Sequence, residues 1–146
     1  MTDIKKYFLK EKNRLIRQLG RNPLTNNQLD EICKNIPKYR GCFMQDELKE
    51  YKNGYYIINT DTKNNTGIHW VAMYNTPKSS YIFDSFGRDT HKIMPILKKT
   101  IQGGGRKIVE SDKDQDQKNS QVCGHLCIAW ILCSREFGIK KTIKYI

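Results

Sequence analysis

A stretch close to the C-terminus constrains the fold of this chain most. Residues 121–137 read as a helix that is apolar on almost every side, and Gly138 is predicted to end it. A helix that lacks a polar face is stable only when other elements surround it. Residues 121–137 are therefore predicted to lie at the centre of a domain. The apolar side chains of this stretch are Leu126, Ile128, Ala129, Trp130, Ile131 and Leu132.

The other predicted elements, which must cover this helix, are three helices and a set of short strands. Residues 3–19 carry an apolar stripe typical of a helix, and Thr25 is predicted to cap a second one. Residues 90–101 are predicted to be helical, whereas residues 37–54 are interpreted as a connecting region and residues 111–120 as an exposed loop. Strands are predicted at 55–59, 68–74, 80–84 and 106–110.

These elements predict an α+β domain: a small mixed β-sheet flanked by helices, with the buried central helix carrying a cysteine at its N-terminus. With 146 residues the chain has the size of one domain, so we interpret residues 1–146 as a single domain. No apolar run approaches the roughly 18–20 residues needed to span a bilayer. The first residues lack the apolar segment of a secretory signal. We therefore expect a protein that is not secreted and has no membrane partner.

The cysteine content predicts free thiols, because five cysteines are an odd number for a disulfide framework. One of them, Cys123, is placed as a nucleophile. With Ser120 as the predicted N-cap it lies in the first helical turn, where free backbone amides and the helix dipole favour a thiolate. Gly124 follows it and leaves the approach to the sulfur open, so we expect Cys123 and Gly124 to meet the substrate.

A thiolate nucleophile needs a base, and the chain has three histidines. His125 follows Cys123 by two residues on the same helix, so their side chains diverge, and His91 falls at the start of a surface helix. His69 begins an apolar strand and is the best candidate. Asp84 ends the next predicted strand, and neighbouring antiparallel strands would bring it beside His69 to orient the imidazole.

The oxyanion formed during such chemistry needs hydrogen-bond donors. The backbone amide of Cys123 is one, and a glutamine from the preceding loop is the other; the loop offers Gln115, Gln117 and Gln121. The spacing of Cys123, His125 and Cys127 also raises the question of a metal. Helical geometry turns His125 away from the two cysteines, so we predict no metal site.

Three segments resemble the histidine, acid and Gln…Cys-Gly blocks of the adenain-like cysteine proteases. They are Gly-Ile-His-Trp-Val-Ala-Met-Tyr at 67–74, Tyr-Ile-Phe-Asp-Ser-Phe-Gly at 81–87, and Gln-Lys-Asn-Ser-Gln-Val-Cys-Gly-His-Leu-Cys at 117–127. This group contains the adenovirus maturation protease and, more distantly, the SUMO-specific proteases. The chain is most similar to the capsid-maturation proteases of virophages and polinton-type viruses, over roughly residues 22–137.

The resemblance implies the adenain-like fold and a role for each motif residue. It implies His69 as the base, Asp84 as its orienting acid and Cys123 as the nucleophile. It places Gln117 in the oxyanion hole, with Gln115 as the alternative. Trp70 is expected to line a narrow substrate tunnel or to cover His69. The resemblance implies no cofactor for the chemistry, with activation by DNA or by a viral peptide.

The formal net charge of +11 indicates affinity for a polyanion, although an AT-rich genome also produces such an excess of lysine. The resemblance makes non-specific DNA binding the functional interpretation. Basic residues concentrate at 5–17, 88–107 and 135–144.

The resemblance implies a cysteine endopeptidase that cleaves viral capsid precursor proteins after small, glycine-type residues during virion maturation. We expect a monomer located in the virion and in the cytoplasm or nucleus of the infected cell. Two alternatives stay open. One is a protease that deconjugates SUMO or ubiquitin, and the other is a catalytically silent DNA-binding domain.

Overall fold

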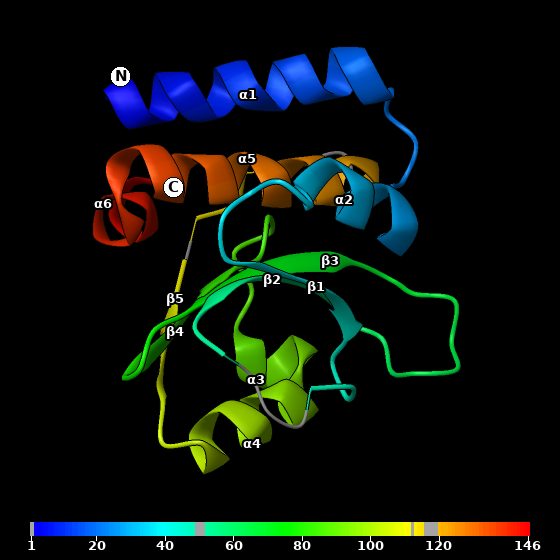
Figure 1. The fold of residues 1–146 in the computed structure, drawn as a ribbon, viewed down its shortest axis with the longest axis vertical. Helices are drawn as coiled ribbons and strands as arrows, with labels where there is room; N and C mark the ends of the chain where they lie inside the picture. Colours follow the sequence, from blue (N-terminus) through cyan, green and yellow to red (C-terminus); the bar gives the residue numbers. More distant parts are fainter. Residues whose placement is uncertain (1, 49–51, 112, 116–119) are drawn as a thin grey trace.

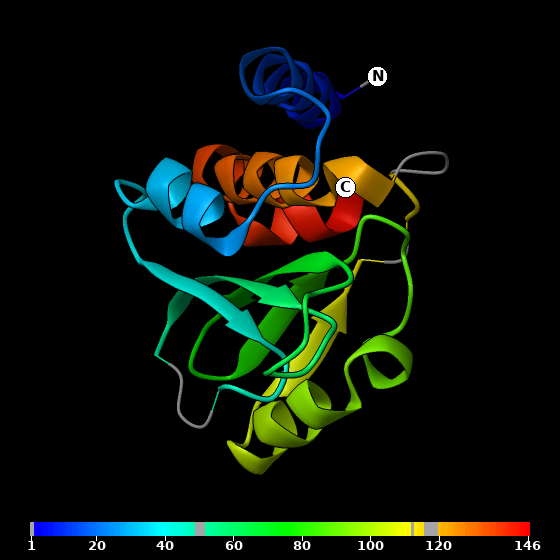
Figure 2. The same cartoon turned by 90° about the vertical axis from the view of Figure 1, so that its right-hand side faces the viewer.

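The computed structural model describes residues 2–48, 52–111, 113–115 and 120–146. Its elements form layers around one five-stranded sheet (Figure 1). Helices α1 (Asp3–Leu19), α2 (Asn26–Cys33), α5 (Cys123–Phe137) and α6 (Ile139–Tyr145) cover one face of the sheet, and α3 (Thr90–Ile93) and α4 (Pro95–Gly103) cover the other. Figure 2 shows that α1 is the outermost layer and that α5 lies between it and the sheet. The α+β class predicted from the sequence is confirmed.

The two N-terminal helices form as their capping residues predict. The Thr2 side chain accepts a hydrogen bond from the backbone amide of Lys5 at the start of α1, which ends at Gly20. Thr25 caps α2 and forms a reciprocal capping box with Gln28.

The sheet is mixed, as predicted, and its strands follow one another in chain order. The inner strands are antiparallel neighbours, while each edge strand runs parallel to the strand beside it. Both faces of the sheet are apolar because alternate side chains enter two cores: Ile57 packs towards α5, and Ile58 packs towards α4. The strands are β1 (Tyr39–Met44), β2 (Gly54–Asn59), β3 (Trp70–Asn75), β4 (Ser79–Phe83) and β5 (Lys107–Glu110).

The interpretation of residues 37–54 as a connection is wrong, because β1 lies within them. β1 is an edge strand with half-exposed side chains, and its register with β2 shifts between Tyr39 and Gly41. It therefore lacks the alternation by which a strand is recognised. The helix predicted at 90–101 is divided at Met94, because Pro95 disfavours helical geometry in the residue before it and begins α4.

Helix α5 occupies the centre of the domain, as its composition predicts. Eleven of its 15 residues are buried, and it packs between α1 and β3. The predicted N-cap at Ser120 is wrong: residues Ser120–Val122 form a 3₁₀ turn, so the α-helix begins at Cys123 without a side-chain cap. Cys123 nevertheless lies in the first turn. Among the described residues, no helix has the length and hydropathy of a membrane span.

Candidate active site

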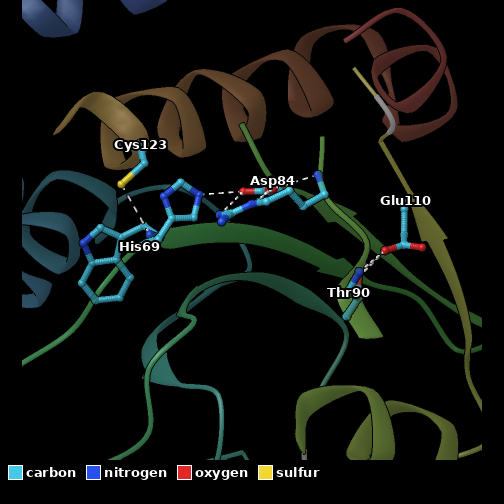
Figure 3. Close-up of polar contacts among 7 residues, drawn as sticks. His69, Asp84, Thr90, Glu110 and Cys123 are labelled. Atoms are coloured by element: carbon cyan, nitrogen blue, oxygen red, sulfur yellow. Dashed lines mark hydrogen bonds and ion pairs between the residues drawn. The ribbon is translucent and has the colours of Figure 1, made fainter. Parts of the chain in front are cut away.

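Three side chains from different elements meet at one end of the sheet (Figure 3). His69 directly precedes β3, and Asp84 directly follows β4. Because these strands are antiparallel neighbours, the start of one lies beside the end of the other. Cys123 is the first residue of α5, which packs on β3. The structure thus brings together His69, Asp84 and Cys123, as the sequence predicted.

The imidazole of His69 lies between the other two side chains (Figure 3). Its Nε2 atom is 2.6 Å from Oδ1 of Asp84, and the two side chains are only 4% and 1% exposed. Burial by itself lowers the pKa of His69, but hydrogen bonds to the Asp84 carboxylate and the Cys123 thiol outweigh it and raise this pKa to about 9. These contacts therefore favour the protonated imidazole.

Asp84 stays ionised although it is buried. Burial by itself raises the pKa of this carboxyl, but hydrogen bonds from His69 and from the side chain and backbone of Arg88 outweigh it and hold the pKa well below its usual range. Neither Arg88 nor Phe86, whose ring stacks on His69, was found from the sequence. The available signal was their position in the turn that follows a candidate catalytic acid.

The sulfur of Cys123 is held from the sheet side as well. The backbone amide of Trp70 donates to Cys123 Sγ over 3.4 Å, and an amide donor stabilises negative charge on sulfur. Four other thiols lie in surroundings that disfavour their charged form. Burial raises the pKa of Cys33 and of Cys133 to about 12, and it raises those of Cys42 and Cys127 well above the usual range. These four are protonated at neutral pH.

Cys123 opens into a cleft of about 480 Å³, a volume within the range of ligand-binding pockets. Trp70 lines this cleft, and its indole Nε1 donates to the carbonyl oxygen of Leu24 over 2.8 Å, which fixes the opposite wall to β3. Ile68 also lines the cleft and is 77% exposed. The residues around the cleft come from five segments: Pro23–Asn26, Cys42–Met44 with Glu47, Asn59, Asn65–Ile68 with Trp70, and Gln121 with Cys123.

The loop that leads to His69 is organised by Asn59, which sequence reasoning missed. The Oδ1 atom of Asn59 accepts hydrogen bonds from the backbone amides of Asp61 and Ile68, both over 2.9 Å. Gly67 has a φ of 98° and passes close to the Asn59 amide, where a Cβ would lie only 3.1 Å from it. His69 therefore lies just before β3, whereas the sequence predicted that it lies inside the strand.

The predicted substrate contact at Gly124 has a different environment in the structure. Gly124 is buried, and a Cβ on it would lie 3.3 Å from Leu24 and 3.4 Å from Leu29. Its small size therefore allows α5 to pack closely against α2. His125 also has a structural partner, because its Nε2 atom lies 2.7 Å from the carbonyl oxygen of Gly20.

The three candidate oxyanion glutamines are placed differently. Gln117 lies outside the described residues. Gln115 is tied to other parts of the chain: its Nε2 donates to the carbonyl oxygen of Ile146 over 2.7 Å, its Oε1 accepts from Lys5, and its backbone amide donates to Ser85. Gln121 lines the cleft beside Cys123. Within the described part of the chain, no cluster of three or more histidine, cysteine or acidic side chains could hold a metal.

Comparison with known proteins places this geometry in context. A model of the adenovirus endoprotease family matches residues 41–144. The chain is 26% identical to a protease of Bovine adenovirus 2 over 129 residues, which cover 80% of the chain and 58% of that relative. It is 36% identical to a protease of Bovine adenovirus C serotype 10 over 50 residues, which cover 34% of the chain and 26% of that relative.

Solved structures give a further similarity. A crystal structure of an ASFV protease covers 86% of this chain at 18% identity, with a TM-score of 0.48, and the match spans 63% of that structure.

Proposed function

Since the chain belongs to the adenovirus endoprotease family, we propose that it is a cysteine endopeptidase whose Cys123, His69 and Asp84 form the catalytic triad. The arrangement of His69 between a carboxylate and a thiol at the edge of a cleft supports the proposal most. It supplies a nucleophile, a proton carrier and an orienting anion in one row, which acyl transfer requires.

The proposed reaction has two steps: Cys123 is acylated first, and the resulting thioester is then hydrolysed. Cys123, as the thiolate paired with protonated His69, attacks the carbonyl carbon of the scissile peptide bond. The imidazolium gives its proton to the leaving amine, and an acyl-thioester remains on Cys123. Water then attacks the thioester carbonyl carbon while His69 accepts a proton from it, and the C–S bond breaks, which releases the carboxylate product and regenerates the Cys123 thiolate beside protonated His69. Asp84 keeps the imidazole oriented throughout.

We assign the oxyanion site to the backbone amide of Cys123 and to the side-chain amide of Gln117. Cys123 is the first residue of α5, and the backbone amides of a first helical turn point out of the helix end. Gln115 is bonded to Ile146 and Lys5, which favours Gln117 of the two. We expect Gln117→Ala to lower kcat about a hundredfold. Gln115→Ala should instead lower the free energy of unfolding, because it removes the hydrogen bonds to Ile146 and Lys5.

The substrates we propose are viral capsid precursor proteins, cleaved after small residues in the virion or the infected cell. The experiment is incubation of the purified chain with the capsid precursor of its own virus. We expect cleavage by the unmodified chain and by Cys133→Ala, and no cleavage by Cys123→Ala. A SUMO or ubiquitin conjugate tested in parallel separates capsid maturation from deconjugation. Hydrolysis of the conjugate alone would contradict the capsid assignment.

We also propose non-specific DNA binding by the neighbouring helices α1 and α6. Exposed lysines and arginines lie on both, at Lys6, Lys10, Arg17, Lys140, Lys141 and Lys144. Such binding releases counterions, so its affinity should fall steeply between about 50 and 200 mM salt. Fluorescence anisotropy measures the affinity for duplex DNA at each salt concentration. An affinity that does not change with salt concentration would contradict the proposal. A rise in peptidase activity on adding DNA would show that the duplex is also an activator.

A further inference from the structure

Arg88 binds the carboxylate of Asp84 through its side chain and its backbone amide. Arg88 donates to Oδ2 twice, from its side-chain Nε and from its backbone amide, each over 2.9 Å, and its Nη2 lies 3.3 Å from Oδ1. The other contact of Oδ1 is His69 Nε2, at 2.6 Å. Oδ2 is thus occupied by Arg88, which leaves Oδ1 to face the imidazole.

The chain reaches this arrangement through a tight turn. The backbone amide of Gly87 donates to the carbonyl oxygen of Asp84 over 2.8 Å, and Gly87 has a φ of 68°. This left-handed conformation suits glycine and directs the next amide, that of Arg88, back to the Asp84 side chain. The turn therefore gives the carboxylate a backbone donor and a guanidinium from one residue.

Arg88 also touches the ring that covers His69. Its guanidinium carbon lies 5.0 Å from the centre of the Phe86 ring. The same ring stacks on the His69 imidazole with 5.2 Å between ring centres and an interplanar angle of 26°. A cation at this distance from an aromatic ring is attracted to it. Arg88 thus contacts two of the groups that pack against the imidazole, the Asp84 carboxylate and the Phe86 ring.

We propose that Arg88 is a positioning residue of the triad: it fixes which oxygen of Asp84 faces His69 and holds Phe86 on the imidazole. The proposal rests on the proposed function and adds a residue to it. An ordinary surface ion pair contributes little, but here the carboxylate is 1% exposed while the arginine side chain is 43% exposed. Arg88 replaces the water that a buried carboxylate has lost.

The first test is an NMR titration of His69 in a Cys123→Ala background, which removes the thiol. Of the described residues, the charged and titratable groups that face His69 are then Asp84 and, behind it, Arg88. Arg88→Met removes a positive charge that lies near the imidazolium. Loss of this repulsion stabilises the imidazolium, so the His69 titration midpoint should rise by about half a pH unit. Arg88→Lys keeps the charge and should move the midpoint less.

Arg14→Met is the matched control. It breaks an ion pair on α1 whose arginine is about as exposed as Arg88 but whose carboxylate lies away from the triad: Arg14 Nε lies 2.6 Å from Glu11. It should leave the His69 midpoint unchanged. An Arg88→Met midpoint equal to that of Arg14→Met would overturn the proposal. If Arg88→Met does not fold, the same comparison with Arg88→Lys decides.

The second test is kinetic and uses the unmodified Cys123. Arg88→Met should lower kcat about tenfold without changing KM, and Arg88→Lys should recover part of the loss. A merely structural role would lower the melting temperature and leave kcat of the folded enzyme unchanged, which would also overturn the proposal. If the unmodified chain cleaves no substrate, the proposed function fails, while the titration still reports on Arg88.

Discussion

Nε2 of His69 and Oδ1 of Asp84 lie 2.6 Å apart in the interior of the protein, at the neighbouring ends of two antiparallel strands. Burial favours the neutral form of each group, yet the pKa of His69 is raised and that of Asp84 is lowered, because each stabilises the charged form of the other. The contact therefore links proton binding to folding.

This linkage predicts a pH-dependent stability. The pKa of His69 is about 9 in the folded chain against 6.5 unfolded, so its stabilising contribution is complete below about pH 6.5 and is lost as the pH rises through 9. The lowered pKa of Asp84 acts oppositely: its contribution is present above about pH 4 and is lost as the pH falls through its folded value. The pair stabilises most between about pH 4 and 6.5.

Asp84→Asn tests the alkaline side of this dependence. The variant should be less stable than the unmodified chain at pH 6, by up to about 3 kcal/mol, and the difference should shrink by pH 9.5. Urea unfolding at both pH values measures it. Asp89→Asn is the control, because its carboxylate is half exposed and lies 3.7 Å from Lys92 Nζ. A difference for Asp84→Asn that stays constant with pH would contradict the linkage.

The thiols should react selectively with iodoacetamide. Burial raises the pKa of Cys33, Cys42, Cys127 and Cys133, so these should stay protonated and unreactive at pH 7. We expect Cys123 to be alkylated first, and peptide mass mapping identifies the site. Cys42 is the informative comparison because it borders the same cleft. Faster labelling of Cys42 than of Cys123 would argue for a catalytically silent domain.

Trp70→Phe should loosen one wall of the cleft. The substitution removes the indole N–H that donates to the Leu24 carbonyl, so we expect a loss of about 1 kcal/mol in the free energy of unfolding. Because Leu24 lines the cleft, KM should rise about threefold. Trp130→Phe is the control: Trp130 is buried against Phe83 and does not line the cleft, so it should change stability but not KM.

Gly124→Val distinguishes packing from substrate contact. The added carbons would press on Leu24 and Leu29, so we expect a loss of about 2 kcal/mol in the free energy of unfolding. Gly103→Val serves as control because a Cβ there meets open space. Thermal unfolding and KM are measured for both. A Gly124→Val enzyme of unchanged stability with a strongly raised KM would restore the substrate role predicted from the sequence.

Much of the architecture was accessible from the sequence because it depends on local properties. An all-round apolar helix must be central, and α5 is. Thr25 with Gln28 and Gly138 mark helix ends through their own backbone chemistry. The order of a histidine, an acid and a cysteine at two predicted strands and a helix indicated His69, Asp84 and Cys123 as candidates, and the structure brings these three side chains together.

Other features became visible only in the folded chain. β1 escaped notice because its partly buried side chains show no clear alternation of apolar and polar residues. The small size of Gly124 depends on Leu24 and Leu29 of other segments. The hydrogen bonds of Arg88 to Asp84 likewise depend on the geometry of a turn, which the amino-acid sequence alone does not specify.

Apart from β1 and the division of the helix at Met94, the sequence by itself determined which segments become helices or strands and which residues can carry the chemistry, because capping, periodicity and side-chain type act over a few residues. Only the tertiary structure decided the distances among His69, Asp84 and Cys123 and the walls of the cleft. Those depend on how elements distant in the chain pack together, through many weak contacts that no single stretch of sequence contains.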